Sequence, residues 1–118
     1  MSTREKVIHY SEVRPEEVKG AVKTRIRVLI SEKDGAPTYA MRIFEVDPGG
    51  EILEHTHPWE HEIFILKGKL KLKIGDKYYE VSEGTAIYIP PNIPHAYWNV
   101  GQEVAVFICT IPIKPSRT

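Results

Sequence analysis

The chain has 118 residues, and its 16 Lys and Arg side chains balance 16 Asp and Glu. This length supports one hydrophobic core and predicts a single domain over 1–118. Because the charges are balanced and interspersed, we expect neither nucleic acid nor a membrane as a partner. The single cysteine excludes an internal disulfide, and neither a signal-peptide-like start nor an apolar run of about twenty residues is present. A cytoplasmic location is therefore expected.

The first twenty residues are expected to form an N-terminal strand or arm. KVIHY at 6–10 has the composition of a strand that could pair with a second copy's sheet, which predicts a homodimer. SEVRPEEVKG at 11–20 could hold a helical turn, with Pro15 near its start and Gly20 past its end.

The rest of the chain has the pattern of short strands. Apolar and basic residues alternate from 22 to 30, which predicts a strand with one buried face. Further strand-like segments lie at 39–46, 51–57, 61–67, 69–74, 77–82, 85–90, 95–100 and 103–111. Turn-forming residues separate these segments, and Gly75-Asp76 predicts a hairpin. About ten short strands predict an all-β sandwich or barrel.

Four of the five histidines lie in two segments, HTHPWEH at 55–61 and PPNIPH at 90–95. His55 and His57 are two residues apart, so on one strand they share a face and can chelate one metal ion. Pro58 should bend the chain and bring His61 back at the start of the next strand. His95 begins another strand and can supply a fourth nitrogen only if the sheet curls.

Both segments resemble the motifs of the cupin superfamily. The first motif, G-x5-H-x-H-x3-E-x6-G, matches over about 49–68, with His61 at the position of the glutamate. The second, G-x5-P-x-G-x2-H-x3-N, matches over about 84–99, with Asn92 at the second glycine. Asparagine tolerates the left-handed turn conformation, so we expect Asn92 to preserve the turn. Histidine in place of glutamate keeps a ligand and removes its charge.

The resemblance implies a small single-domain cupin, a β-barrel of the double-stranded β-helix or jelly-roll type. It also implies His55, His57, His61 and His95 as the ligands of one divalent metal ion. The competing interpretation is a solvated loop, or a core histidine bonded to a carbonyl. His9 has no partner nearby and suits a surface or interface. Glu60 and Glu62 should face outward, because alternation turns them away from His61.

Four neutral imidazoles suit manganese, iron, copper, nickel or zinc, and the sequence does not choose among them. An octahedral ion with four protein ligands leaves two open positions, whereas tetrahedral zinc leaves none. Without a carboxylate ligand the ion keeps its full double charge and should polarise oxygen donors.

Five further residues are candidates for the pocket or for contacts with the ligands. Tyr97 and Asn99 share the strand face of His95, and Tyr97 could equally be a packing residue. Arg42 would pair with a carboxylate or enolate substrate if it points inward, and would be a surface charge if it points outward. Phe107 and Cys109 share a face, and the resemblance implies an inner-wall position for both. Cys109 is either a small buried hydrophobe or a reactive thiol.

Three functions remain open for a small chelating organic substrate. The first is a metal-dependent, dioxygenase-like oxidoreductase, in which an electron-rich substrate meets dioxygen. The second is a cupin that binds metal and ligand, or acts as a sensor, without catalysis. The third and weaker one is a sugar isomerase, because that chemistry needs a carboxylate base and no inward carboxylate is evident.

Overall fold

The computed structural model describes residues 4–113, and almost every regular element in it is a β-strand. The strands are β1 (Glu16–Glu17), β2 (Ala21–Ile30), β3 (Tyr39–His55), β4 (His61–Lys67), β5 (Lys69–Ile74), β6 (Lys77–Ser82), β7 (Ala86–Ile89), β8 (His95–Trp98) and β9 (Ala105–Pro112). Two short 3₁₀ turns, η1 (Tyr10–Glu12) and η2 (Glu32–Asp34), precede β1 and β3. None of the described helical segments has the length and apolarity that a membrane-spanning helix needs.

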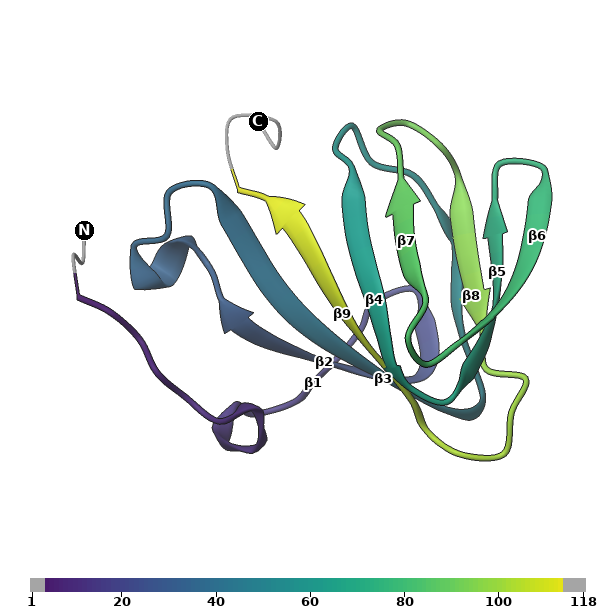
Figure 1. Ribbon diagram of the computed structural model, residues 1–118, viewed down its shortest axis with the longest axis horizontal. Helices are drawn as coiled ribbons and strands as arrows, with labels where there is room; N and C mark the ends of the chain where they lie inside the picture. Colours follow the sequence, from purple (N-terminus) through teal and green to yellow (C-terminus); the bar gives the residue numbers. More distant parts are fainter. Residues whose placement is uncertain (1–3, 114–118) are drawn as a thin grey trace.

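The strands form one antiparallel sheet in the order β6-β5-β8-β3-β9-β4-β7, with β2 added on β3 and β1 on β2. Figure 1 shows this sheet curling so that β4 and β7 face β8 and β5 across an interior. The expected small cupin-type β-barrel is therefore confirmed. The predicted hairpin at Gly75-Asp76 is confirmed too, because Ile74 pairs with Lys77.

Strand β3 is longer than the sequence indicated. The segments 39–46 and 51–57 were expected to be separate strands, but 39–55 is continuous and passes from β9 to β8. Gly50 makes this passage possible, because a Cβ there would lie 2.8–2.9 Å from three backbone oxygens. The Asp47-Pro48-Gly49-Gly50 stretch therefore bends the strand instead of reversing it. Asn92 adopts a φ of 65°, which confirms the expected left-handed turn.

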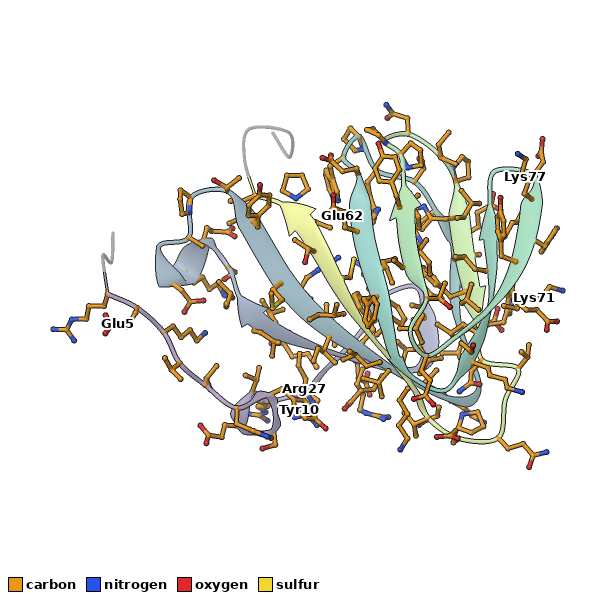
Figure 2. The ribbon with its side chains drawn as sticks, in the orientation of Figure 1. Glu5, Tyr10, Arg27, Glu62, Lys71 and Lys77 are labelled. Atoms are coloured by element: carbon orange, nitrogen blue, oxygen red, sulfur yellow. The ribbon has the colours of Figure 1, made fainter. Side chains whose placement is uncertain are left out.

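The N-terminal arm differs from its prediction. Residues 6–10 form no strand in this single chain, and helical structure within 11–20 stops at Glu12. Pro15 cannot donate a backbone hydrogen bond, and beyond it Glu16 and Glu17 pair with β2. Arg27 holds the arm by donating to the carbonyl oxygen of Val13 at 2.7 Å, and lies beside Tyr10 (Figure 2).

The core lies between the two curled halves of the sheet. Inward residues alternate along β9, where every second side chain is buried from Ala105 to Ile111. Val46, Ile65, Leu70 and Ile89 contribute from the surrounding strands, each less than 2% exposed. Packing therefore fixes the strand ends that carry the histidines.

Candidate metal centre and pocket

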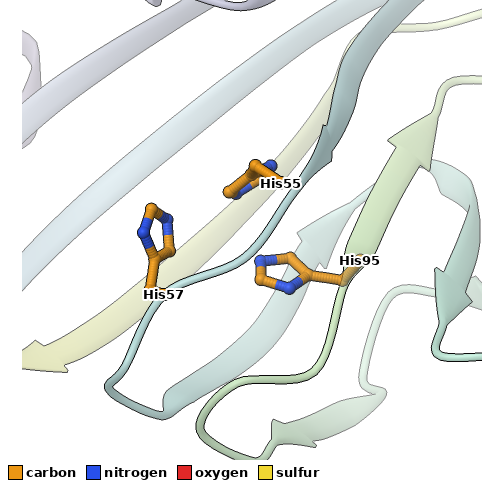
Figure 3. Close-up of side chains that lie close together, drawn as sticks. All are labelled: His55, His57 and His95. Atoms are coloured by element: carbon orange, nitrogen blue, oxygen red, sulfur yellow. The ribbon is translucent and has the colours of Figure 1, made fainter.

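Three of the predicted ligands meet at one point. His55 ends β3, His57 follows it in the loop, and His95 opens β8. One ring nitrogen from each of the three lies within 4.8 Å of the others. Figure 3 shows the three rings converging from two neighbouring strand ends. The β3–β8 ladder produces this meeting, because His55 and His95 are directly paired across it.

His61 lies beside these three histidines but is not part of the group whose nitrogens are within 4.8 Å of one another. It opens β4, is 4% exposed, and its ring centroid lies 4.8 Å from that of His95 and 5.3 Å from that of His57. The group with mutually close nitrogens contains only His55, His57 and His95. The Nδ1 atom of His61 is buried and has no hydrogen-bond partner among the described residues.

Backbone carbonyls orient two of the rings. Nδ1 of His55 donates to the carbonyl oxygen of Leu53 at 2.8 Å, and Nδ1 of His95 donates to that of Ile93 at 2.9 Å. A carbonyl oxygen only accepts, so each Nδ1 carries the proton and Nε2 keeps its lone pair. In His95 this Nε2 is buried with no partner within the described part of the chain.

The surroundings keep the imidazoles neutral. Burial, followed by repulsion from His55 and His95, lowers the pKa of His57 to about 4. Burial, followed by repulsion from His95 and His57, lowers the pKa of His61 to about 3. Burial also lowers the pKa of His95, partly offset by its hydrogen bond to Ile93. At neutral pH these rings therefore present lone pairs instead of charges.

The donor set fits a divalent transition metal. Neutral imidazole is a common ligand of such ions, and a buried nitrogen without a partner is costly unless something accepts its lone pair. His61 Nδ1 and His95 Nε2 are both such atoms. Among the described residues, the close group consists of histidines alone.

A cavity of about 390 Å³ opens beside the histidines, and its walls are largely apolar. Four of the five further candidates line it: Arg42, Tyr97, Phe107 and Cys109. Arg42 therefore points inward, and Phe107 and Cys109 both lie in the inner wall of the cavity. Tyr97 is 4% exposed, and its ring stacks on Phe107 at 5.3 Å between centroids.

Asn99 is the exception, because it does not line this cavity. Its Nδ2 donates to the carbonyl oxygens of Val46 at 2.8 Å and Glu103 at 2.9 Å. Its Oδ1 accepts from the amide of Gly101. Strand β8 ends at Trp98, so the alternation that linked Asn99 to Tyr97 stops before it. Asn99 fastens the loop between β8 and β9.

The remaining predictions concern residues outside the cluster. Glu62 is exposed, as expected, and Glu60 is half-buried in the loop before β4. His9 lies in the exposed arm, where Nδ1 contacts Ser11 at its hydroxyl and amide. None of these three residues lines the cavity beside the histidines.

Trp59 and Glu54 are among the cavity residues that the sequence analysis missed. The Trp59 ring stacks on that of His57, with centroids 4.5 Å apart and planes 6° apart. Its position inside HTHPWEH was an available signal. Glu54 also lines the cavity, and its carboxylate accepts from Lys73 at 2.7 Å. No local pattern distinguishes Glu54 from an ordinary exposed strand residue, because β5 supplies its partner.

Comparison with known proteins gives the family. A family model described as a cupin domain matches residues 42–111. The solved polyketide cyclase RemF from Streptomyces resistomycificus is 36% identical, with a TM-score of 0.88, and the match covers 98% of this chain and 85% of that one. The polyketide synthase CurC of Streptomyces cyaneus is 26% identical over 95% of this chain and 73% of its own. The solved structure of a predicted oxalate decarboxylase from Thermotoga maritima is 22% identical, with a TM-score of 0.82. The match covers 92% of this chain and 100% of that one, and at this identity it shows the fold alone. The chain belongs to the cupin family.

Proposed function

We propose that this protein is a metal-dependent cupin that closes rings in a small organic molecule with several carbonyl groups. The observation that carries the proposal is a cluster of neutral histidines beside a largely apolar cavity of about 390 Å³. Its natural partner is a small molecule, since cavities of this size and lining suit such ligands.

In this proposal, His55, His57, His61 and His95 hold one divalent transition metal ion. The hydrogen bonds at Nδ1 of His55 and His95 support it, because they leave Nε2 available as a ligand atom. The partnerless Nδ1 of buried His61 supports its inclusion as the fourth ligand. A bound ion supplies Lewis acidity, which polarises carbonyl oxygens.

The cavity walls would exclude water and hold a flat substrate. Phe44 stacks on Phe107 with centroids 5.1 Å apart, and Tyr97 stacks on the same Phe107. Burial raises the pKa of Tyr97 well above its ordinary value, so its phenol stays protonated at neutral pH. Tyr97 would therefore donate a hydrogen bond to a substrate oxygen instead of removing a proton.

The resemblance to RemF and CurC, both named for polyketide chemistry, favours ring closure as the reaction class. In such a step, a carbon beside one carbonyl loses a proton and bonds to the carbon of another carbonyl. The second carbonyl oxygen takes up that proton and becomes a hydroxyl group. This hydroxyl leaves as water together with a second proton from the neighbouring carbon, and a carbon–carbon double bond forms. Atoms and electrons balance without any oxidant, so dioxygen is not required.

A dioxygenase-like reaction on a chelating enol is the second candidate. The all-histidine donor set favours it, because neutral ligands leave the ion strongly Lewis acidic. A cupin that binds metal and ligand without turnover shares every feature but catalysis. The isomerase is least favoured, since Glu54 is the one carboxylate described in the cavity wall and it is already paired with Lys73.

The deciding experiment compares one substrate with and without oxygen. Metal-loaded protein is incubated with a linear triketone, whose ring closure and dehydration give a dihydroxytoluene. We expect product lighter than substrate by one water, formed equally under nitrogen and under air, and lost in His57→Ala. Product that gains oxygen and forms only in air would support the dioxygenase-like alternative. Binding by calorimetry without either product would support a non-catalytic cupin.

A further inference from the structure

Arg42 is a half-buried cation in the inner wall of the cavity. Strand alternation places Arg42 between Ala40 and Phe44 on the inward face of β3. Its pairing partner across the β3–β9 ladder is Cys109, which lines the same cavity. The other cation of the lining is Lys19, which is exposed in the segment before β2.

Two neighbours fix the orientation of the guanidinium group. Nη2 of Arg42 donates to the sulfur of Cys109 at 3.1 Å. The central guanidinium carbon lies 5.1 Å from the centroid of the Phe44 ring, a contact in which the aromatic face attracts the cation. Thiol and ring position the group, but neither carries a negative charge that would neutralise it.

No carboxylate neutralises this charge within the structure. The ion pairs seen among residues 4–113 do not include Arg42. Its Nε is buried and has no hydrogen-bond partner in that part of the chain. Arginine stays protonated in proteins, and a half-buried charge without an anionic partner is less favourable than a paired one. The site is therefore suited to an anion brought in by a ligand.

Charge decides from which side the anion would approach. Arg42 also borders a second cavity of about 430 Å³, whose lining holds the carboxylates of Glu16, Glu32 and Asp34 and the cations of Lys6 and Lys33. Lys6 pairs with Asp34 at 3.0 Å, and the remaining carboxylates outnumber the remaining lysine, so this side is the less favourable one for an anion. In the cavity beside the histidines, the described lining holds a single carboxylate, that of Glu54, and Lys73 pairs with it at 2.7 Å. An anion is therefore favoured on the histidine side.

We infer that Arg42 is the residue that selects the ligand of this cavity, and that this ligand carries a carboxylate. The inference rests on the proposed function, because it names the substrate class of the same cavity. The planar guanidinium fork matches the two oxygens of a carboxylate. The stacked rings of Phe44 and Phe107 accept the flat body to which that carboxylate is attached. A substrate spanning Arg42 and the histidines would be oriented along the cavity.

The test compares benzoate with benzamide, which have the same shape and differ in charge. Dissociation constants are measured by calorimetry on purified protein, with its metal content determined in parallel. The variants are Arg42→Gln, which removes the charge, and Arg42→Lys, which keeps it without the fork. Lys19→Gln is the control, because it removes a cation from the exposed rim. Urea unfolding establishes that each variant is folded.

We expect wild type to prefer benzoate, and Arg42→Gln to weaken benzoate binding by about tenfold or more while leaving benzamide nearly unchanged. Arg42→Lys should keep part of the preference, and Lys19→Gln should keep all of it. Absence of a benzoate preference in wild type would overturn the inference. So would benzoate binding that survives in Arg42→Gln and disappears in His57→Ala, a result that would place the anion on the metal centre and leave the proposed function intact.

Discussion

His55 and His95 stand directly opposite each other in the β3–β8 ladder, with ring centroids 4.3 Å apart. This pairing and the hydrogen bond from the amide of Asn92 to the carbonyl oxygen of His57 at 2.7 Å join the two histidine segments. The geometry of the cluster therefore depends on the register of β3 against β8, and a slip of one residue would turn one ring to the other face of the sheet.

The first prediction concerns metal content. Protein purified without a histidine tag should contain close to one divalent transition metal ion per chain. The ion would accept the lone pairs of the buried His61 and His95 nitrogens, which have no hydrogen-bond partner among the described residues. Elemental analysis by plasma mass spectrometry measures the ratio. A metal-free protein that also fails to take up added manganese, iron, copper, nickel or zinc would eliminate the metal centre.

The second prediction separates His61 from His9. His61→Ala should weaken metal binding by at least about tenfold, because it removes a buried ring beside His57 and His95. His9→Ala should leave metal binding unchanged, since His9 contacts only its own exposed arm. Competition with a chromogenic chelator gives both affinities. Equal affinities in the two variants would remove His61 from the ligand set.

The third prediction concerns stability against pH in metal-free protein. The folded pKa values of His57 and His61, about 4 and about 3, lie below the unfolded value near 6.5. Between these limits the unfolded chain binds more protons, so stability is complete above pH 6.5 and falls as the pH drops. Urea unfolding should show a loss of about 2 kcal/mol for each of the two rings between pH 7 and pH 5.

The His61→Gln variant provides a control for the stability loss between pH 7 and pH 5. Asp34 and Asp47 have pKa values lowered from 3.8, chiefly by hydrogen bonds from Ser31 and Arg25, so their contribution is lost only below about pH 4. His61→Gln removes one of the histidines, and its stability should therefore change less between pH 7 and pH 5. An equally steep decline in this variant would show that His61 does not have a depressed pKa.

The fourth prediction concerns Asn99. Asn99→Ala removes three hydrogen bonds, two to the loop between β8 and β9 and one to the carbonyl oxygen of Val46 in β3. The free energy of unfolding should fall by about 1 to 3 kcal/mol, as measured in urea. Metal affinity should stay within about twofold of wild type, because the amide does not reach the histidines. A large loss of metal affinity would instead make Asn99 part of the centre.

The fifth prediction concerns assembly. Val7 is 95% exposed in an arm that Lys6 ties to the carbonyl oxygen of Leu29, so its apolar surface is available to a second copy. We expect a homodimer in solution, and removal of residues 1–12 should weaken it. Light scattering over a dilution series measures both chains. An unchanged dimer after truncation would exclude the arm from the interface.

The sequence by itself determined the strands and most of the cluster. Alternation located β2 and β4 to β6 within a residue or two, because a strand buried on one face must repeat every second residue. The two-residue spacing of His55 and His57 predicted that they form a chelating pair. The two cupin motifs, in register, implied His95 in the same cluster, and the structure places its nitrogen with theirs.

Only the tertiary structure decided what lies between distant strands. The turn residues around Gly50 bend β3 without ending it, because pairing to β9 and then to β8 holds both halves in one strand. Alternation could not tell whether Arg42 faces inward, and the curl of the sheet set it against Cys109. Asn99 shares the parity of Tyr97, yet its amide bonds to Val46 and Glu103 after β8 has ended. These outcomes depend on long-range pairing, which no local pattern encodes.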